Sequence, residues 1–306
     1  MLQRSLSTLT TKVALFLAVT ATGTATLRAQ DAGRAKESAI SWHTTRSSPD
    51  DLEISGELTG VPAGTTRYLT RADLLALRQV SYTVEGDPNF RGATRVSGVL
   101  LEELSRRFGS RPEADMAVAI CVDLYQAHYP RSYVAAHHPI LVLTINGQPP
   151  ELWPKDGEGQ GVDMGPYLIS HEAFRPSFHV LAHSDEAQIP WGVVRLEFRN
   201  EQSVLGAIAP RGARANDPEV RDGYRIAQQN CFRCHNMGSE GGRRARHPWF
   251  VLAGWAASSP EYFAAYVRDP KKRNSQSQMP GSPDFDNATV QALMAYFRTF
   301  VVEEKP

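Results

Sequence analysis

The sequence predicts a multidomain chain in which an α+β domain comes first and an all-α domain follows. Short β-branched runs alternate with short helical patterns between residues 52 and 199. Apolar residues at helical spacing dominate only after residue 217. A stretch of small and basic residues, 206–216, separates the two patterns and is typical of a linker. At 306 residues the chain is long enough for each domain to bury a core of its own.

The first 29 residues have the pattern of a secretory signal peptide. Arg4 and Lys12 give a positive start, residues 13–19 form a short apolar run, and Leu27-Arg28-Ala29 precedes the expected cleavage site. The apolar run is too short to span a bilayer about 30 Å thick. An uncleaved N-terminal anchor is the alternative, because Arg28 is unusual beside a cleavage site. We therefore expect an exported, periplasmic protein with no integral membrane segment after cleavage.

The remaining boundaries follow from the same patterns. We expect a flexible leader at 30–50, the α+β domain at 51–203, the linker at 204–216 and the all-α domain at 217–306. The elements expected in the α+β domain are a helix capped by Thr70, a helix at 99–108, and strands at 118–122, 140–145 and 193–198. In the all-α domain we expect helices at 218–230, 260–267 and 287–301, the second with Tyr262, Phe263, Tyr266 and Val267 as its apolar face. The formal net charge is zero, so the composition indicates no nucleic-acid partner.

One motif carries specific chemistry. Cys231-Phe232-Arg233-Cys234-His235 matches C-x-x-C-H, the attachment sequence of haem c. Two residues between the thiols let one helical turn present both sulfurs to the two vinyl groups at one edge of a porphyrin, and the histidine then ligates the iron. A zinc site would need a second cysteine pair, and a redox dithiol would need a thioredoxin-like pattern, neither of which the sequence has. We therefore predict one covalent haem on Cys231 and Cys234, with His235 as its proximal iron ligand.

The second axial ligand is chosen from four candidates. Met237 is two residues from His235 and cannot reach the opposite face of the ring, and Met294 falls on the apolar face of the last helix. Met279 stands in a loop 44 residues after His235, and the following proline stiffens its backbone. We therefore expect Met279 to be the distal ligand; the alternatives are His247 as that ligand, or Met279 packed against the ring without ligation.

From residue 217 onward the chain resembles a small class I cytochrome c. The resemblance is carried by residues 223–224, the C-x-x-C-H motif, Met279-Pro280 and residues 294–297, in that order. It implies that the first and last helices cross at Gly223, where the missing side chain permits close approach. It also implies a haem wall made of Trp249, Phe250, Leu252 and Tyr266, each of which could instead be ordinary core. The basic groups at 243–246 and 271–273 either guide an acidic redox partner or form a solvated surface.

Residues 69–198 are similar to the molybdopterin-binding domain of the sulfite-oxidase family. The matching segments, in the order of that family, are 69–75, 83–86, 96–104, 143–149, 165–167 and 191–198. That family ligates molybdenum through a cysteine just before the Glu85-Gly86 element. In this chain Thr83 or one of its neighbours takes that place, no cysteine is near, and a hydroxyl is a poorer donor to a soft metal. We therefore expect no molybdopterin. The remaining cysteine, Cys121, lies in a predicted strand and is read as a buried apolar filler, with a metal ligand as the alternative.

Six histidines of this domain, namely His128, His137, His138, His171, His179 and His183, match no zinc template. We expect them to be exposed or hydrogen-bonded; the alternative is that one of them contacts a ligand or anion. The primary prediction is therefore a periplasmic c-type cytochrome that passes single electrons to a redox partner protein, with the first domain as a docking or regulatory module and no catalytic residue. Two alternatives stay open: a sulfite-dehydrogenase-like oxidoreductase whose first domain binds molybdopterin or another cofactor, and a sensor whose first domain binds a small ligand.

Overall fold

The computed structural model describes residues 40–155 and 161–301. The expected signal peptide and residues 30–39 of the expected leader lie outside the described residues. Described residues 40–50 of that leader contact the sheet: Trp42 packs on Phe108 with ring centroids 5.3 Å apart, and the His43 N–H donates to the carbonyl of Tyr68 at 3.1 Å. From residue 40 onward the described chain belongs to one compact unit.

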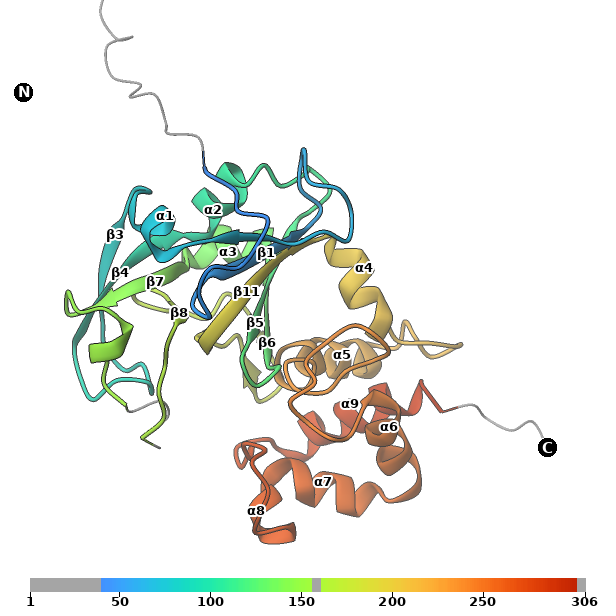
Figure 1. Ribbon diagram of the computed structural model, residues 1–306. Coiled ribbons are helices and arrows are strands. Elements are labelled where there is room, and N and C mark those ends of the chain that lie inside the picture. Colours follow the sequence, from blue (N-terminus) through green and yellow to red (C-terminus); the bar gives the residue numbers. More distant parts are fainter. Residues whose placement is uncertain (1–39, 156–160, 302–306) are drawn as a thin grey trace, which may run out of the picture. The chain divides into compact units, whose positions relative to one another are not determined.

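A large mixed sheet makes up the first part of the described chain (Figure 1). Its strands are β1 (Leu52–Gly56), β2 (Arg67–Leu69), β3 (Val80–Val84), β4 (Thr94–Leu100), β5 (Met116–Cys121), β6 (Gln126–Pro130), β7 (Ile140–Ile145), β8 (Tyr167–Ser170) and β11 (Trp191–Arg199). The order is β2-β1-β11-β8-β7-β4-β3, and β5 pairs with both β11 and β6. Among the described residues, the β1–β11 pair is parallel and the other strand pairs of this sheet are antiparallel. A separate hairpin joins β9 (His179–Val180) to β10 (His183–Ser184).

Short helices flank the sheet, and the described chain after β11 is helical. Those of the first part are α1 (Arg71–Leu75), α2 (Leu101–Arg107), α3 (Arg131–His137) and the 3-10 turn η1 (Pro150–Leu152). Those of the second part are α4 (Glu201–Leu205), η2 (Gly206–Ile208), α5 (Pro218–Asn230), α6 (Trp249–Ser258), α7 (Pro260–Arg268), α8 (Pro270–Arg273) and α9 (Asn287–Arg298). Among the described residues, no helix has both the length and the apolar character needed to cross a membrane.

Several predicted elements are confirmed, and one helix begins later than predicted. Strand β7 has the predicted bounds, and Thr70 caps α1 through a capping box with Asp73. The helix predicted at 99–108 begins only at Leu101, because Val99 and Leu100 are still paired with β7. The hydrogen bonds that pair β4 with β7 therefore keep Val99 and Leu100 in a strand, although the leucines that follow have helical spacing.

Helices α5 and α9 pack against each other (Figure 1). Gly223 lies at their contact. A Cβ atom placed on Gly223 would lie 2.0 Å from the carbonyl oxygen of Ala292, so only glycine permits this approach. The crossing that the resemblance implied is confirmed. Around it lies a buried apolar cluster that includes Val220, Ile226 and Phe297.

The stretch expected to be a linker is partly structured. Residues 201–208 form α4 and η2, and Ile208 is fully buried. Tyr296 in α9 donates its hydroxyl to the carbonyl of Ile208 at 2.5 Å, and Tyr224 donates to the carbonyl of Leu205 at 3.1 Å. Two hydrogen bonds thus connect the start of this stretch to helices α5 and α9.

Two details of the helical part differ from the sequence-based expectations. In α7 only Phe263 is buried, whereas Tyr262 is 39% exposed, so the predicted apolar face is narrower. Helix α6 was not anticipated as a helix, because its residues are apolar all round and show no helical period.

Candidate haem site

The C-x-x-C-H motif forms one further turn at the end of α5. The N–H of Cys231 donates to the carbonyl of Ala227 at 2.9 Å, which continues the helix. The N–H groups of Cys234 and His235 both donate to the carbonyl of Cys231, at 3.2 and 2.9 Å. Neither cysteine forms a disulfide, and both are only partly buried. The structure therefore brings Cys231, Cys234 and His235 together on one turn, as the motif requires.

The imidazole of His235 is oriented by a backbone group. Its Nδ1 lies 2.6 Å from the carbonyl oxygen of His247, and the residue is 8% exposed. A carbonyl can only accept, so Nδ1 carries the proton and Nε2 keeps its lone pair. Burial lowers the pKa of His235, which favours the neutral ring that ligates metals. An outer hydrogen bond of this kind fixes the tautomer of a metal-ligating histidine.

The loop after the motif folds back on the motif and needs two glycines. The N–H of Gly242 donates to the carbonyl of Phe232 at 2.9 Å, and a Cβ on Gly242 would lie 1.7 Å from the carbonyl oxygen of Arg233. Gly241 has a φ of +86°, and a Cβ there would lie 2.4 Å from the ring of Phe232. The Gly241-Gly242 pair was the sequence signal for this closure, and it was missed.

Met279 lies on a loop that is anchored to α7. The hydroxyl of Tyr266 donates to Ser277 Oγ at 3.1 Å, and the N–H of Ser282 donates to the carbonyl of Val267 at 3.0 Å. The side chain of Met279 is half-buried. By contrast, Met294 is 4% exposed within the core of α9.

The residues expected to wall the haem do not share one environment. Trp249 is fully buried and packs on Phe232 and Phe297, with ring centroids 5.6 and 5.0 Å apart. Leu252 is 8% exposed, whereas Phe250 is 63% exposed. Trp249 is therefore core for the helical part.

The sheet supports the motif from the other side through the hairpin of β5 and β6. The N–H of Gln126 donates to the carbonyl of Arg233 at 2.9 Å, and the N–H of Arg243 donates to the carbonyl of Leu124 at 2.9 Å. Arg244 Nε lies 3.0 Å from a carboxylate oxygen of Asp123. One arginine of the basic group at 243–246 is thus paired with the sheet. This support could not be predicted from the sequence, because it depends mostly on backbone groups that are distant along the chain.

A second contact joins the hairpin to the motif. His128 in β6 stacks on Phe232, with ring centroids 5.0 Å apart and planes 18° from parallel. Both ring nitrogens of His128 are buried and lack hydrogen-bond partners among the described residues. The expectation that the six histidines are all exposed or hydrogen-bonded is therefore wrong for His128. Burial between aromatic and apolar groups is the reason, and it lowers the pKa of His128 to about 3.

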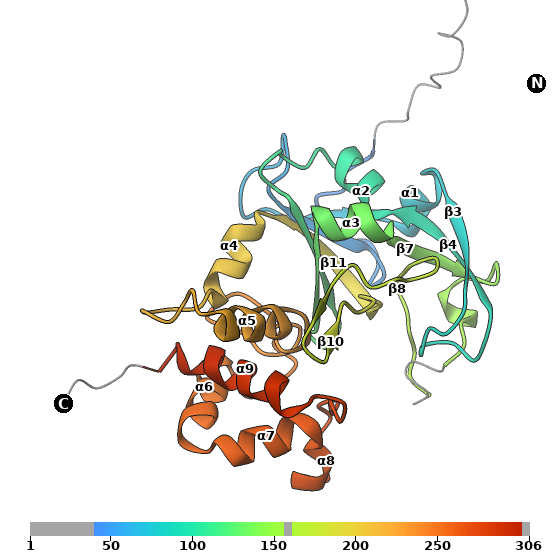
Figure 2. The same ribbon diagram turned by 180° about the vertical axis from the view of Figure 1, so that it is seen from behind.

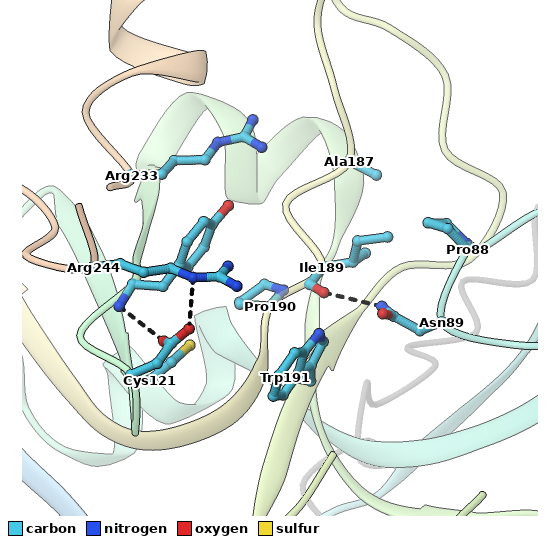
Figure 3. A pocket seen from close by; sticks show the side chains of 11 residues that line it. Pro88, Asn89, Cys121, Ala187, Ile189, Pro190, Trp191, Arg233 and Arg244 are labelled. Carbon is cyan, nitrogen blue, oxygen red and sulfur yellow. Dashed lines mark hydrogen bonds and ion pairs between the residues drawn. The ribbon is translucent and has the colours of Figure 1, made fainter. Parts of the chain in front are cut away.

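A small pocket adjoins the motif (Figure 3). It has a volume of about 130 Å³ and is lined by Pro88, Asn89, Cys121, Asp123, Tyr125, Ala187, Ile189, Pro190, Trp191, Arg233 and Arg244. Cys121 is 2% exposed, and burial raises the pKa of its thiol. Thr83 is exposed on β3. Among the described residues, no group of three or more His, Cys, Asp or Glu side chains could hold a metal ion.

Comparison with known proteins bears on this geometry. The model of the family described as cytochrome C oxidase, cbb3-type, subunit III matches residues 218–297, which contain the whole motif and its loop. Residues 218–297 form a cytochrome c domain. This domain includes α5, α9 and the turn that carries Cys231, Cys234 and His235.

Two individual proteins are similar to parts of the chain. Cytochrome c oxidase subunit 2 of Alkalihalophilus pseudofirmus is 32% identical over 93 residues, or 28% of this chain and 27% of that protein. The chain thus spans about a quarter of the length of that relative. The sulfane dehydrogenase SoxCD of Paracoccus pantotrophus superposes with a TM-score of 0.33 and 17% identity, over 52% of this chain and 40% of that chain. The cytochrome c domain supports a role in haem electron transfer.

Proposed function

We propose that this protein is an exported electron carrier with one haem c held covalently by Cys231 and Cys234. The observation that carries the proposal is the 2.6 Å contact between His235 Nδ1 and the carbonyl of His247, on the same turn as two cysteines that form no disulfide. This turn offers two nucleophilic sulfurs and one imidazole Nε2, which is the donor set that haem c uses. Bound haem supplies reversible one-electron chemistry, so the chain need only hold it and set its potential.

Met279 is proposed as the second axial ligand. Its loop is anchored to α7, which leaves the thioether on a defined segment. The rival His247 has its carbonyl on the Nδ1 side of His235, away from Nε2. Met237 donates its N–H to the carbonyl of Glu240 in the turn that follows the motif, so it stays on the proximal side.

The sheet is proposed to act as a fixed mount and docking module for the haem. Beyond the β5–β6 hairpin, residues of α3 and of the segment around β10 hold the end of α5 through a buried polar network. Figure 2 shows the β10 segment next to α5. Asp185 accepts from Gln229 Nε2 at 2.5 Å and from His137 Nε2 at 3.1 Å, and Gln229 Oε1 lies 3.1 Å from His183 Nε2. Burial opposes the charge of Asp185, but bonds from Ser177 and Gln229 outweigh it and hold the pKa of the carboxyl below its usual value. A rigid mount suits electron transfer at fixed geometry to a periplasmic redox partner.

A sulfite-dehydrogenase-like oxidoreductase is the second candidate. Its support is the pocket beside the motif, in which Cys121 supplies a thiol close to the proposed haem. Two observations favour the carrier instead. The pocket of about 130 Å³ is smaller than the roughly 300–1,000 Å³ of typical cofactor sites, and burial raises the pKa of the Cys121 thiol, which disfavours a thiolate ligand.

Metal analysis decides between the two candidates. Protein made in a periplasm with an active haem-maturation pathway is measured for iron and molybdenum after removal of loosely bound metal. One iron per chain without molybdenum supports the carrier, and near-stoichiometric molybdenum overturns it in favour of the oxidoreductase. A Cys121→Ser variant should keep its full iron content under the carrier proposal, because Cys121 takes no part in haem attachment.

A further inference from the structure

The pocket beside the haem-binding turn is lined by two arginines from the cytochrome c domain. Arg233 is the residue between the two cysteines of the motif, and its side chain is only 13% exposed. Figure 3 shows its guanidinium group and that of Arg244 extending to the same side, toward the segment that contains Ile189 and Pro190. The opposite wall is formed by the sheet part, with Trp191 and Asn89 among its residues. The motif thus places a positive charge in the wall of this cavity.

Arg233 has unused donors there. Its Nε and Nη2 are buried and make no hydrogen bond with the described residues. Nη2 lies 3.4 Å from a carboxylate oxygen of Glu186, a distant ion pair whose acid is 47% exposed. A buried guanidinium with free N–H groups is costly unless an acceptor approaches it. The Arg233 side chain is hydrogen-bonded to Tyr125, but an acceptor that entered the pocket would also satisfy Nε and Nη2.

Arg244 supplies the second charge at the rim. Its Nε is engaged by Asp123 at 3.0 Å, and its side chain is 32% exposed. Asp123 also accepts from the N–H of Tyr125 at 3.0 Å, so its carboxylate is held at the end of the hairpin. Asp123 therefore positions Arg244 and at the same time reduces the positive charge of the pocket.

We infer that this pocket binds a small inorganic oxyanion between Arg233 and Arg244, and that binding is linked to the redox state of the haem. Planar guanidinium groups bind tetrahedral and trigonal oxyanions through charge-assisted hydrogen bonds. The volume of about 130 Å³ suits an anion of a few atoms and leaves no room for a nucleotide or an organic cofactor. Oxyanion binding needs no haem, but the redox linkage rests on the proposed function.

The sign of the linkage follows from charge. Arg233 lies between the residues that attach the haem, so an anion held there is close to the iron. Negative charge stabilises the oxidised, more positive haem, so the anion binds more tightly to the ferric form and lowers the reduction potential. A tenfold difference in affinity between the two oxidation states corresponds to about 59 mV.

Sulfate is a suitable probe because it is not redox-active under these conditions. Binding to the ferric holoprotein is measured by titration calorimetry at constant ionic strength, with chloride as the balancing salt. The wild type, Arg244→Gln, Asp123→Asn and the matched control Arg243→Gln are compared. Arg243 is adjacent in sequence and does not line this pocket.

We expect saturable binding to the wild type, a loss of about tenfold or more in Arg244→Gln, and little change in Arg243→Gln. Asp123→Asn should bind more tightly, because it frees Arg244 of its competing carboxylate. Sulfate should lower the haem potential of the wild type but not that of Arg244→Gln. Equal weakening in the two arginine variants, or no saturable binding to the wild type, would overturn the site.

The linkage and the proposed function fail in different ways. Saturable binding without a shift in potential would overturn the linkage and leave the site. A preparation that contains no haem would contradict the proposed function, and the calorimetric comparison of the four proteins would still decide whether the oxyanion site exists.

Discussion

His128 lies flat against Phe232, with ring centroids 5.0 Å apart, so a strand of the sheet packs directly on the residue between Cys231 and Arg233. Burial, with Arg233 and Arg199 adding repulsion, lowers the pKa of this histidine to about 3. His171 is similarly buried, and its pKa is also lowered to about 3 by burial. Both imidazoles are therefore neutral in the folded protein over most of the accessible pH range.

These two histidines predict how stability depends on pH. Their folded pKa values lie below the usual value of 6.5, so the unfolded chain binds more protons between pH 6.5 and about 3. The free energy of unfolding should be unaffected by them above pH 6.5 and should fall as the pH drops below it. Each contributes a slope of about 1.4 kcal/mol per pH unit. Urea unfolding of wild type and His128→Phe at several pH values checks this, and an identical slope in the two proteins would contradict it.

Much of the fold could be predicted locally, and the contacts that fix the site could not. Strand β7 is a continuous apolar run that ends at Asn146-Gly147, and helix α5 begins with Pro218 and has apolar residues at helical spacing, so their bounds were predictable. Leu100 was assigned to a helix because its pairing with Ile140 depends on a partner 40 residues away. Cys231, Cys234 and His235 were identifiable because the spacing of a C-x-x-C-H motif is the one that haem attachment requires. The carbonyl of His247 was not, since any residue supplies a carbonyl and only the loop path brings it to His235.

The crossing of α5 and α9 gives a prediction about stability. Gly223→Ala would place a methyl group 2.0 Å from the carbonyl oxygen of Ala292, so one helix must move. We expect a loss of about 1–3 kcal/mol in the free energy of unfolding, despite the better helix propensity of alanine. Gly254→Ala is the matched control in α6, where a Cβ meets nothing within 4 Å, and it should stabilise by about 0.5–1 kcal/mol. Comparable effects of the same sign would contradict the close approach.

The proposed distal ligand gives a spectroscopic prediction. Met279→Ala should abolish the thioether-to-iron charge-transfer band of the ferric protein and lower the haem potential by on the order of 0.1 V, because thioether ligation favours reduced iron. Met294→Leu is the control, since Met294 is 4% exposed in the core of α9 and should leave the band intact. Persistence of the band in Met279→Ala would exclude Met279 as the ligand.

The mount between sheet and haem domain gives a further prediction. Gln229→Ala removes a donor to Asp185 and an acceptor for His183, so two buried polar groups lose a partner. We expect a loss of about 1–3 kcal/mol in the free energy of unfolding. Hydrogen exchange should rise in both β10 and the end of α5, because the network joins them. Increased exchange confined to α5 would show that the network does not hold the two parts together.

Covalent attachment of haem at residues 231–235 is the central claim, and intact mass spectrometry after acidic acetone extraction tests it most directly. The periplasmically matured protein should keep the mass of one haem on the polypeptide, and an alkylating reagent should modify Cys121 alone, and only after unfolding. A colourless polypeptide, or one that loses its haem to the solvent while Cys231 and Cys234 become alkylated, would contradict the account.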